Sequence, residues 1–138
     1  MENNKDLYGF LHPELIGEKE IVVSSRFKDK DGKVIPFTIR PLSQDVCDEI
    51  QKQCIRTDKK GNSVFDRVKY VSETTAASVV FPDLQNADLQ KAYGVLGSVQ
   101  LLSKMLYSNE YNDLVEAVQE LSGLNESFQE VKDEAKNV

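Results

Sequence analysis

The chain has 138 residues, of which 40% are hydrophobic and 29% are charged, and its formal net charge is -6 at pH 7. A chain of this length buries roughly 70% of the surface that its unfolded form exposes, so one domain over residues 1–138 needs neither disulfides nor a metal. No apolar run approaches the ~20 residues of a membrane helix, and the first residues do not resemble a secretory signal. We therefore expect one cytoplasmic domain that does not enter a membrane.

The negative charge is concentrated in the second half of the chain. Residues 1–69 hold 13 lysines and arginines against 12 aspartates and glutamates, whereas residues 70–138 hold 4 against 11. A negative electrostatic field repels nucleic acid and favours a basic partner. The simpler interpretation is a solvated helix surface whose charge keeps the protein soluble. The charge pattern predicts no nucleic-acid binding and leaves both uses of the acidity open.

The N-terminal half predicts a β-hairpin after a first segment, residues 1–18, that we expect to be mobile. Apolar residues alternate over 21–28 and again over 35–39, with turn residues at 29–32 between them. Pro36 cannot donate to a ladder, so the second strand lies at a sheet edge or places this residue on its unpaired side. An open edge would also accept an extended peptide.

The middle of the chain predicts two helices. Ser43 is a suitable N-cap for the first helix, which ends near Ile55. A polar loop follows at 58–62, and β-branched residues at helical spacing predict the second helix over 64–79. The end of that helix, residues 78–81, could instead form a short strand.

The C-terminal third predicts further helices. Asn86 and Ser98 are candidate N-caps for two short helices, and Asn109 is the candidate for a helix over 110–122. Apolar residues recur there at three- and four-residue steps, a spacing that indicates helix-on-helix packing and a surface made for another protein. These residues are Leu101, Leu102, Met105, Leu106, Tyr111, Leu114, Val115, Val118 and Leu121.

The last segment, residues 125–138, predicts a helix that is not stable by itself. Three glutamates at four-residue spacing form a row of like charge beside a small apolar face. Because isolated helices of this length are marginal in water, we expect this tail to be mobile unless it lies on its own chain or on a partner. The whole pattern predicts an α+β fold, with an N-terminal β-hairpin packed beside a mainly α-helical bundle that ends in a C-terminal helical hairpin.

No residue pattern predicts catalysis or a bound cofactor or metal. Cys47 and Cys54 lie roughly 10 Å apart on one predicted helix, too far for a disulfide, and we interpret both as core residues. A metal site or a cysteine nucleophile would need further groups, and His12 is the only histidine. Gly94 and Gly97 lack the strand and the lysine of a phosphate-binding loop. These absences favour a binding protein over an enzyme.

Partner contact is expected from five residues. Tyrosine covers apolar area while its hydroxyl stays hydrogen-bonded, which suits interfaces, although packing at the edge of the core is the simpler role. The apolar side chains of residues 125–138 would be covered by packing against a partner. The candidates are Tyr107, Tyr111, Leu114, Phe128 and Val131.

Short motifs along most of the chain carry a family resemblance. They are Phe37-Thr38-Ile39-Arg40-Pro41-Leu42-Ser43, Lys52-Gln53-Cys54, Val79-Val80-Phe81-Pro82-Asp83, Leu89-Gln90 to Gly94-Val95, Met105-Leu106, Glu110-Tyr111, Val118 to Gly123, and Glu134-Ala135-Lys136-Asn137. In these motifs the chain resembles the XkdN-like family of phage tail assembly chaperones, which is found in tailed phages and prophages.

The resemblance implies a cytoplasmic protein, absent from the finished virion, that binds the long helical tape measure protein. It would keep that protein soluble until tail tube subunits polymerise around it, and competition with the tube protein would release it. If the codons of Ala135-Lys136-Asn137 form a slippery heptamer, a -1 frameshift would add a longer form of the chain as a further partner. Two other functions stay open: a minor structural component of the tail, and an acidic DNA-mimic inhibitor.

Overall fold

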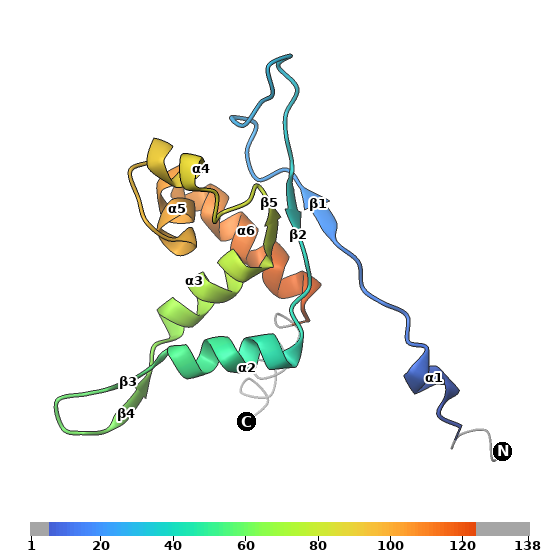
Figure 1. The fold of residues 1–138 in the computed structure, drawn as a ribbon, viewed down its shortest axis with the longest axis vertical. Helices are drawn as coiled ribbons and strands as arrows, with labels where there is room; N and C mark the ends of the chain where they lie inside the picture. The colour runs from blue at the N-terminus through green and yellow to red at the C-terminus, as the bar shows by residue number, and fades with distance from the viewer. Residues whose placement is uncertain (1–5, 124–138) are drawn as a thin grey trace, which may run out of the picture.

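The computed structural model describes residues 6–123. Its elements in chain order are α1 (Tyr8–Leu11), β1 (Lys19–Ile21), β2 (Phe37–Ile39), α2 (Gln44–Gln53), β3 (Ile55–Thr57), β4 (Ser63–Phe65), α3 (Arg67–Ser78), β5 (Val79–Phe81), α4 (Ala87–Ala92), α5 (Ser98–Met105) and α6 (Ser108–Leu121). The predicted α+β class is confirmed, because α3, α5 and α6 pack beside a small antiparallel sheet (Figure 1). The second helix of the predicted C-terminal hairpin lies outside the described residues.

The main sheet has the strand order β1-β2-β5, with both pairs antiparallel. β2 is therefore the central strand, and of the two alternatives predicted from Pro36 the position at a sheet edge is wrong. Pro36 precedes the first paired residue, Phe37, so its missing N–H removes no bond from either ladder. The alternative prediction of a strand at the end of the 64–79 segment is confirmed by β5, which forms one edge of the sheet.

The hairpin between β1 and β2 is paired at its base and near its tip. β1 ends at Ile21, and antiparallel pairing resumes only at the bridge between Lys28 and Val34. The predicted continuous strand over 21–28 is therefore wrong. Between these points the Ser24 hydroxyl accepts a hydrogen bond from the backbone N–H of Arg26 at 3.1 Å, a local bond that competes with a ladder.

A second hairpin, β3-β4, replaces the start of the helix predicted over 64–79. The Asp58 carboxylate accepts two backbone N–H bonds within the turn, each 2.9 Å long, which favours the hairpin over a loose loop. Val64 lies in β4, and the helix begins only after Asp66, whose side chain accepts the backbone N–H of Lys69 at 3.0 Å. Turn and cap chemistry therefore outweigh the helical spacing at this point.

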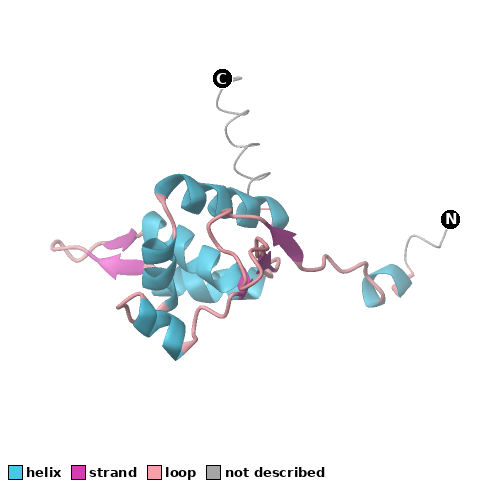
Figure 2. Ribbon diagram, turned by 90° about the horizontal axis from the view of Figure 1, so that it is seen from above, coloured by secondary structure: helices cyan, strands magenta, loops and turns pink. Residues whose placement is uncertain are grey.

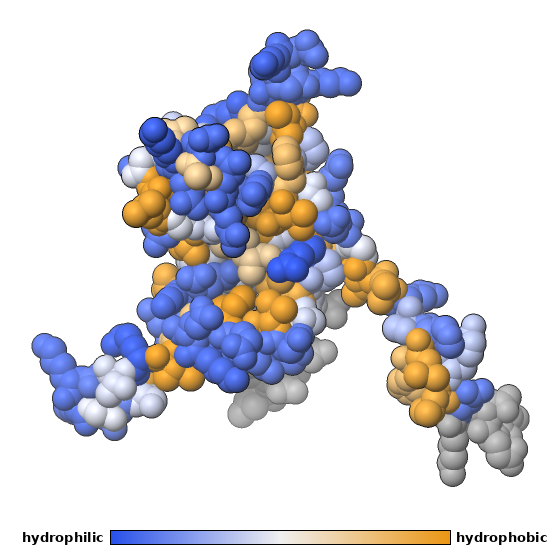
Figure 3. Space-filling view, viewed as in Figure 1, coloured by the Kyte–Doolittle hydropathy of each residue, from blue (hydrophilic) through white to orange (hydrophobic). Residues whose placement is uncertain are grey.

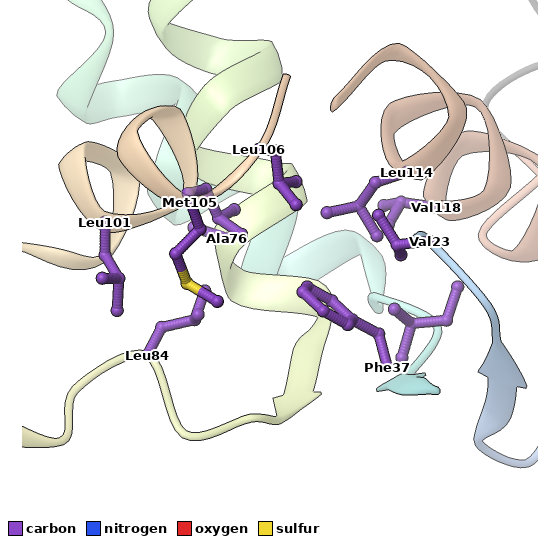
Figure 4. Close-up of a cluster of buried hydrophobic side chains, with 11 residues drawn as sticks. Val23, Phe37, Ala76, Leu84, Leu101, Met105, Leu106, Leu114 and Val118 are labelled. Carbon is purple, nitrogen blue, oxygen red and sulfur yellow. The ribbon is translucent and has the colours of Figure 1, made fainter. Parts of the chain in front are cut away.

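The apolar stripe of the C-terminal third forms the core of the molecule (Figure 4). Leu101 and Leu114 have 0% of their surface exposed and Val118 has 1%, and they cluster with Phe37 of the sheet and Ala76 of α3. The predicted helix-on-helix packing is confirmed. For these buried residues the prediction of a surface for another protein is wrong, because the chain's own sheet and helices cover them, whereas Tyr111 and Val115 of the stripe stay partly exposed.

Two helix caps differ from the predictions. Tyr107 rather than Asn109 is the N-cap of α6, and the backbone N–H of Tyr107 donates to the Glu110 carboxylate at 2.8 Å. A glutamate at the third helical position is well placed for this bond, which a cap at Asn109 would not use. α5 begins at Ser98, and the residue before it is Gly97 with a φ of +109°, a conformation that favours glycine.

Candidate partner-binding surface

Two adjoining hollows between α3 and α6 form one groove, which we call the α3–α6 groove. The first, of about 450 Å³, is lined by Phe65, Arg67, Tyr70, Val71, Thr74, Val115 and Gln119. The second, of about 280 Å³, is lined by Arg67, Val68, Val71, Ser72 and Tyr111. Arg67 and Val71 line both hollows, so the groove is continuous along the two helices.

The groove exists because α3 presents small residues to the core and larger apolar ones to solvent. Its buried side chains are Thr74, Thr75, Ala76 and Ser78, and the Thr75 hydroxyl donates to the backbone carbonyl of Val71 at 2.7 Å. Val68 is 79% exposed and Phe65 is 43% exposed. At one end the Tyr111 hydroxyl donates to the Ser72 hydroxyl at 3.2 Å, which ties α6 to α3. The apolar floor of the groove is thus open to solvent.

The segments that flank the groove carry opposite net charge, and Arg67 is the charged residue among those that line the two hollows. Residues 55–69, which span β3, β4 and the start of α3, hold five lysines and arginines against two aspartates. Residues 108–121 of α6 hold four aspartates and glutamates and no lysine or arginine. An apolar groove between a basic and an acidic segment suits an amphipathic helix whose polar face carries both signs.

Tyr107 lies on the surface beside a tightly held ion pair. The Arg26 guanidinium carbon is 4.7 Å from the centroid of the Tyr107 ring, and Arg26 Nε donates to Glu110 Oε2 at 3.0 Å. The hydrogen bond from Arg26, with further bonds from the Ser24 hydroxyl and the Tyr107 backbone, lowers the pKa of Glu110 to about 2. Glu110 is therefore ionised at neutral pH and fixes the start of α6 against the β1-β2 hairpin.

The structure separates the five predicted contact residues. Tyr111 lines the α3–α6 groove, and Tyr107 is 67% exposed but is not among the residues that line this groove. Leu114 belongs to the core, so its predicted contact with a partner is wrong for this fold. Phe128 and Val131 lie outside the described residues.

Sequence reasoning missed most of the groove. Val68, Val71 and Val115 were visible as periodic apolar residues, but their spacing alone predicts a core face. The informative signal was the run of small residues in the second half of α3, which is the buried part of that helix. Val68 at the other end of α3 is 79% exposed.

Nothing in the described part of the chain is arranged for catalysis at a metal. Residues 6–123 contain no group of histidine, cysteine, aspartate and glutamate side chains that could hold a metal ion. Cys47 and Cys54 are free and buried, which confirms their interpretation as core residues, and burial raises the pKa of the Cys54 thiol. Within the same residues, no helix has the length and apolarity to cross a bilayer.

Comparison with known proteins decides the family. The sequence profile described as "Phage XkdN-like tail assembly chaperone protein" matches residues 7–136. The chain belongs to this family of phage tail assembly chaperones. Its relatives include the phage-like element PBSX protein XkdN of Bacillus subtilis (strain 168), which is 30% identical over 143 residues that cover 99% of this chain and 97% of XkdN.

A second similar protein, YqbN, has a crystal structure to which the fold of this chain can be compared. The uncharacterized protein YqbN of the same Bacillus subtilis strain is 25% identical over 125 residues, which cover 87% of this chain and 84% of YqbN. The crystal structure of YqbN superimposes with a TM-score of 0.72 over 86% of this chain and 96% of that chain, at 25% identity. The fold of this chaperone is thus shared with YqbN.

Proposed function

We propose that this tail assembly chaperone acts without catalysis in the host cytoplasm, where it binds the tape measure protein and keeps it soluble during tail assembly. The observation that supports this proposal is the α3–α6 groove, whose apolar floor is open to solvent and whose flanking segments carry opposite net charge. An amphipathic helix lays its apolar face in a groove of this kind. The bound segment is therefore a helical stretch of the tape measure protein.

Shielding apolar helices explains why such a protein is needed before the tail is built. A long helix with an exposed apolar stripe associates with its neighbours in water. A chaperone that covers the stripe and adds its own net charge of -6 keeps the complex soluble. Because the rim of the groove is exposed, the affinity is modest, and polymerising tail tube protein displaces the chaperone by competition.

Co-expression tests this function with a surface substitution. Val68→Glu places a charge at the edge of the groove, at a residue that is already 79% exposed, near the N-terminus of α3 where a carboxylate is tolerated. The matched control is Leu96→Glu, because Leu96 is 89% exposed and does not line the groove. The measurement is the soluble fraction of the tape measure protein after centrifugation of the lysate.

We expect the unaltered chaperone and the Leu96→Glu variant to hold the tape measure protein in solution, and the Val68→Glu variant to lose most of this effect. Equal solubility with and without the unaltered chaperone would overturn the proposed function. A folded Val68→Glu chaperone that works as well as the control would remove the groove as the site. Mass spectrometry of purified particles should find no copy of the chain, whereas a fixed number of copies would make it a structural component.

A further inference from the structure

A separate hollow, which we call the hairpin pocket, lies between the β1-β2 hairpin, the end of β5 and α4. It measures about 300 Å³ and shares no lining residue with the α3–α6 groove. Figures 1 and 2 both show the β1-β2 hairpin apart from the β3-β4 hairpin, which the groove adjoins at Phe65. The hairpin pocket is therefore a second candidate site, and the function proposed so far does not use it.

The lining of the hairpin pocket is apolar or aromatic apart from two cations. Phe81 is 51% exposed and Tyr93 is 36% exposed, so this lining is open to solvent. Figure 3 shows apolar side chains directly below the hydrophilic tip of the β1-β2 hairpin, near the top of the view.

The hairpin side of the pocket is held in place by local contacts. The backbone N–H of Ile35 donates to the Phe27 carbonyl at 2.8 Å, and the centroid of the Phe27 ring lies 5.8 Å from that of the buried Phe37. The pocket is thus preformed. At the small end of the range for ligand pockets, it takes one large apolar side chain rather than the face of a helix.

The charge at the hairpin pocket is positive. Arg26 and Lys28 are the charged residues among those that line it, and none of the lining residues is acidic. The Lys28 side chain is exposed and makes no ion pair with any described residue. The nearest aspartate along the chain, Asp29, accepts two backbone N–H bonds within the turn, each 2.9 Å long. The pocket therefore favours a ligand that carries carboxylates beside an apolar group.

Arg26 offers hydrogen-bond donors in a fixed position. Its Nη2 donates to the Met105 carbonyl at 3.0 Å, its Nε donates to Glu110, and its guanidinium carbon lies 5.0 Å from the centroid of the Phe27 ring. Nη1 has no hydrogen-bond partner within residues 6–123, and the side chain is 42% exposed. A guanidinium held in this way binds a further carboxylate without first being ordered.

We propose that the hairpin pocket binds an extended segment of a partner protein in which one large apolar side chain stands between two acidic residues. The apolar side chain enters the pocket, and the carboxylates bind Arg26 Nη1 and the Lys28 ammonium. Side chains two residues apart in an extended chain point to the same side, so the matching pattern is acidic, any residue, apolar, any residue, acidic. A helix in the α3–α6 groove leaves this pocket open, so the chaperone can hold both ligands at once.

Fluorescence anisotropy with the full-length chain tests the inference. The probe is a dye-labelled peptide, Gly-Glu-Ser-Phe-Ser-Glu-Gly, with an amidated C-terminus. Matched peptides carry glutamine at both glutamate positions or alanine at the phenylalanine position. We expect the probe to bind at least about tenfold more tightly than either matched peptide, because it alone has both the apolar anchor and the carboxylates. Equal binding of either matched peptide would overturn the inference.

Two pairs of variants place the peptide in the pocket. Lys28→Glu reverses a charge that lines it, whereas the control Lys30→Glu makes the same change at the exposed hairpin tip, outside the lining. Phe81→Ser removes part of the wall, whereas the control Val80→Ser changes the neighbouring exposed residue of β5, which does not line the pocket. Lys28→Glu and Phe81→Ser should weaken binding by about tenfold or more, and both controls should bind within about twofold of the unaltered chain.

Circular dichroism of each variant checks that it is folded. The groove variant Val68→Glu should bind the probe like the unaltered chain, so failure here is distinguishable from failure of the proposed function. The inference is overturned if the unaltered chain does not bind the probe at millimolar concentration, or if the folded lining variants bind it like their controls. The chain's own residues 126–130 carry the same pattern, although they follow the far end of α6 from Arg26. Tighter probe binding after truncation at Gly123 would assign the pocket to that segment and exclude a partner protein.

Discussion

Substituting Leu114 distinguishes a core residue from a partner contact. The Leu114 side chain is 0% exposed and belongs to the buried cluster with Leu101 and Val118. Leu114→Ala removes a fully buried side chain and leaves a cavity, at a cost of about 2–5 kcal/mol in the free energy of unfolding. Since small domains are stable by only about 5–15 kcal/mol, we expect a loss of about 3 kcal/mol to be large but survivable.

Urea unfolding followed by circular dichroism measures this loss. With a denaturant slope of about 2 kcal/mol per molar urea, a loss of about 3 kcal/mol lowers the unfolding midpoint by about 1.5 M. The matched variant is Val115→Ala, because Val115 is the next residue along α6 but lines the groove. Its partly exposed side chain should cost about 1 kcal/mol or less.

The effects of the two variants on function should be the reverse of their effects on stability. Folded Leu114→Ala chaperone should still keep the tape measure protein soluble, whereas Val115→Ala should weaken this effect because it removes part of the groove floor. A Leu114→Ala midpoint no lower than that of Val115→Ala would refute the assignment of Leu114 to the core. A folded Leu114→Ala chaperone that no longer binds would restore this residue as a partner contact.

Three further changes each test one feature of the chain. Glu110→Gln should lower the unfolding temperature at pH 7. The pKa of the Glu110 carboxyl falls from 4.5 to about 2 on folding. The stability that the ionised carboxylate contributes is therefore complete above pH 4.5 and is lost as the pH falls toward 2. Thermal scans of both proteins should therefore converge at low pH, and a constant gap would contradict the ion pair with Arg26. Asp66→Ala removes the cap of α3 and should cost about 1 kcal/mol in urea unfolding, so an unchanged midpoint would exclude that cap. Truncation after Gly123 should weaken tape measure binding in co-expression, and unchanged solubility would exclude the tail as a contact.

The elements that could be predicted from the sequence are those with strong local chemistry. The cap at Asn86 is confirmed, since its side chain accepts the backbone N–H of Leu89 at 2.9 Å. The end of α6 is confirmed at Gly123, which has a φ of +76°. In such places the identity of one residue determines the backbone nearby, so no knowledge of the rest of the fold is needed.

Strand order could not be predicted, because it depends on contacts between distant segments. β2 is central only because β5, about 40 residues further along the chain, pairs with its free side. The local signal from Pro36 was correct about the missing donor, yet it said nothing about which residues would be paired. Similarly, the bond between Arg26 and Glu110 joins residues 84 positions apart, and Arg26 lies within the segment that was expected to be a continuous strand.

The binding surface was harder to predict than the fold, because buried and exposed apolar stripes have the same spacing. Leu114 and Val115 are neighbours on one helix, and both fit the periodic pattern. The structure buries Leu114 under the sheet and α5 side chains and leaves Val115 at the groove. Only the packing of α6 against α3 decides which of the two faces a partner.

Photo-crosslinking from the edge of the groove tests the central claim most directly. A photo-reactive amino acid at position 68, with position 96 as the control, is irradiated in cells that also make the tape measure protein, and the linked peptides are identified by mass spectrometry. We predict that position 68 links to tape measure segments whose apolar residues recur at three- and four-residue steps, and that position 96 does not. Equal linkage from both positions, or linkage from position 68 to no tape measure peptide, would contradict this account.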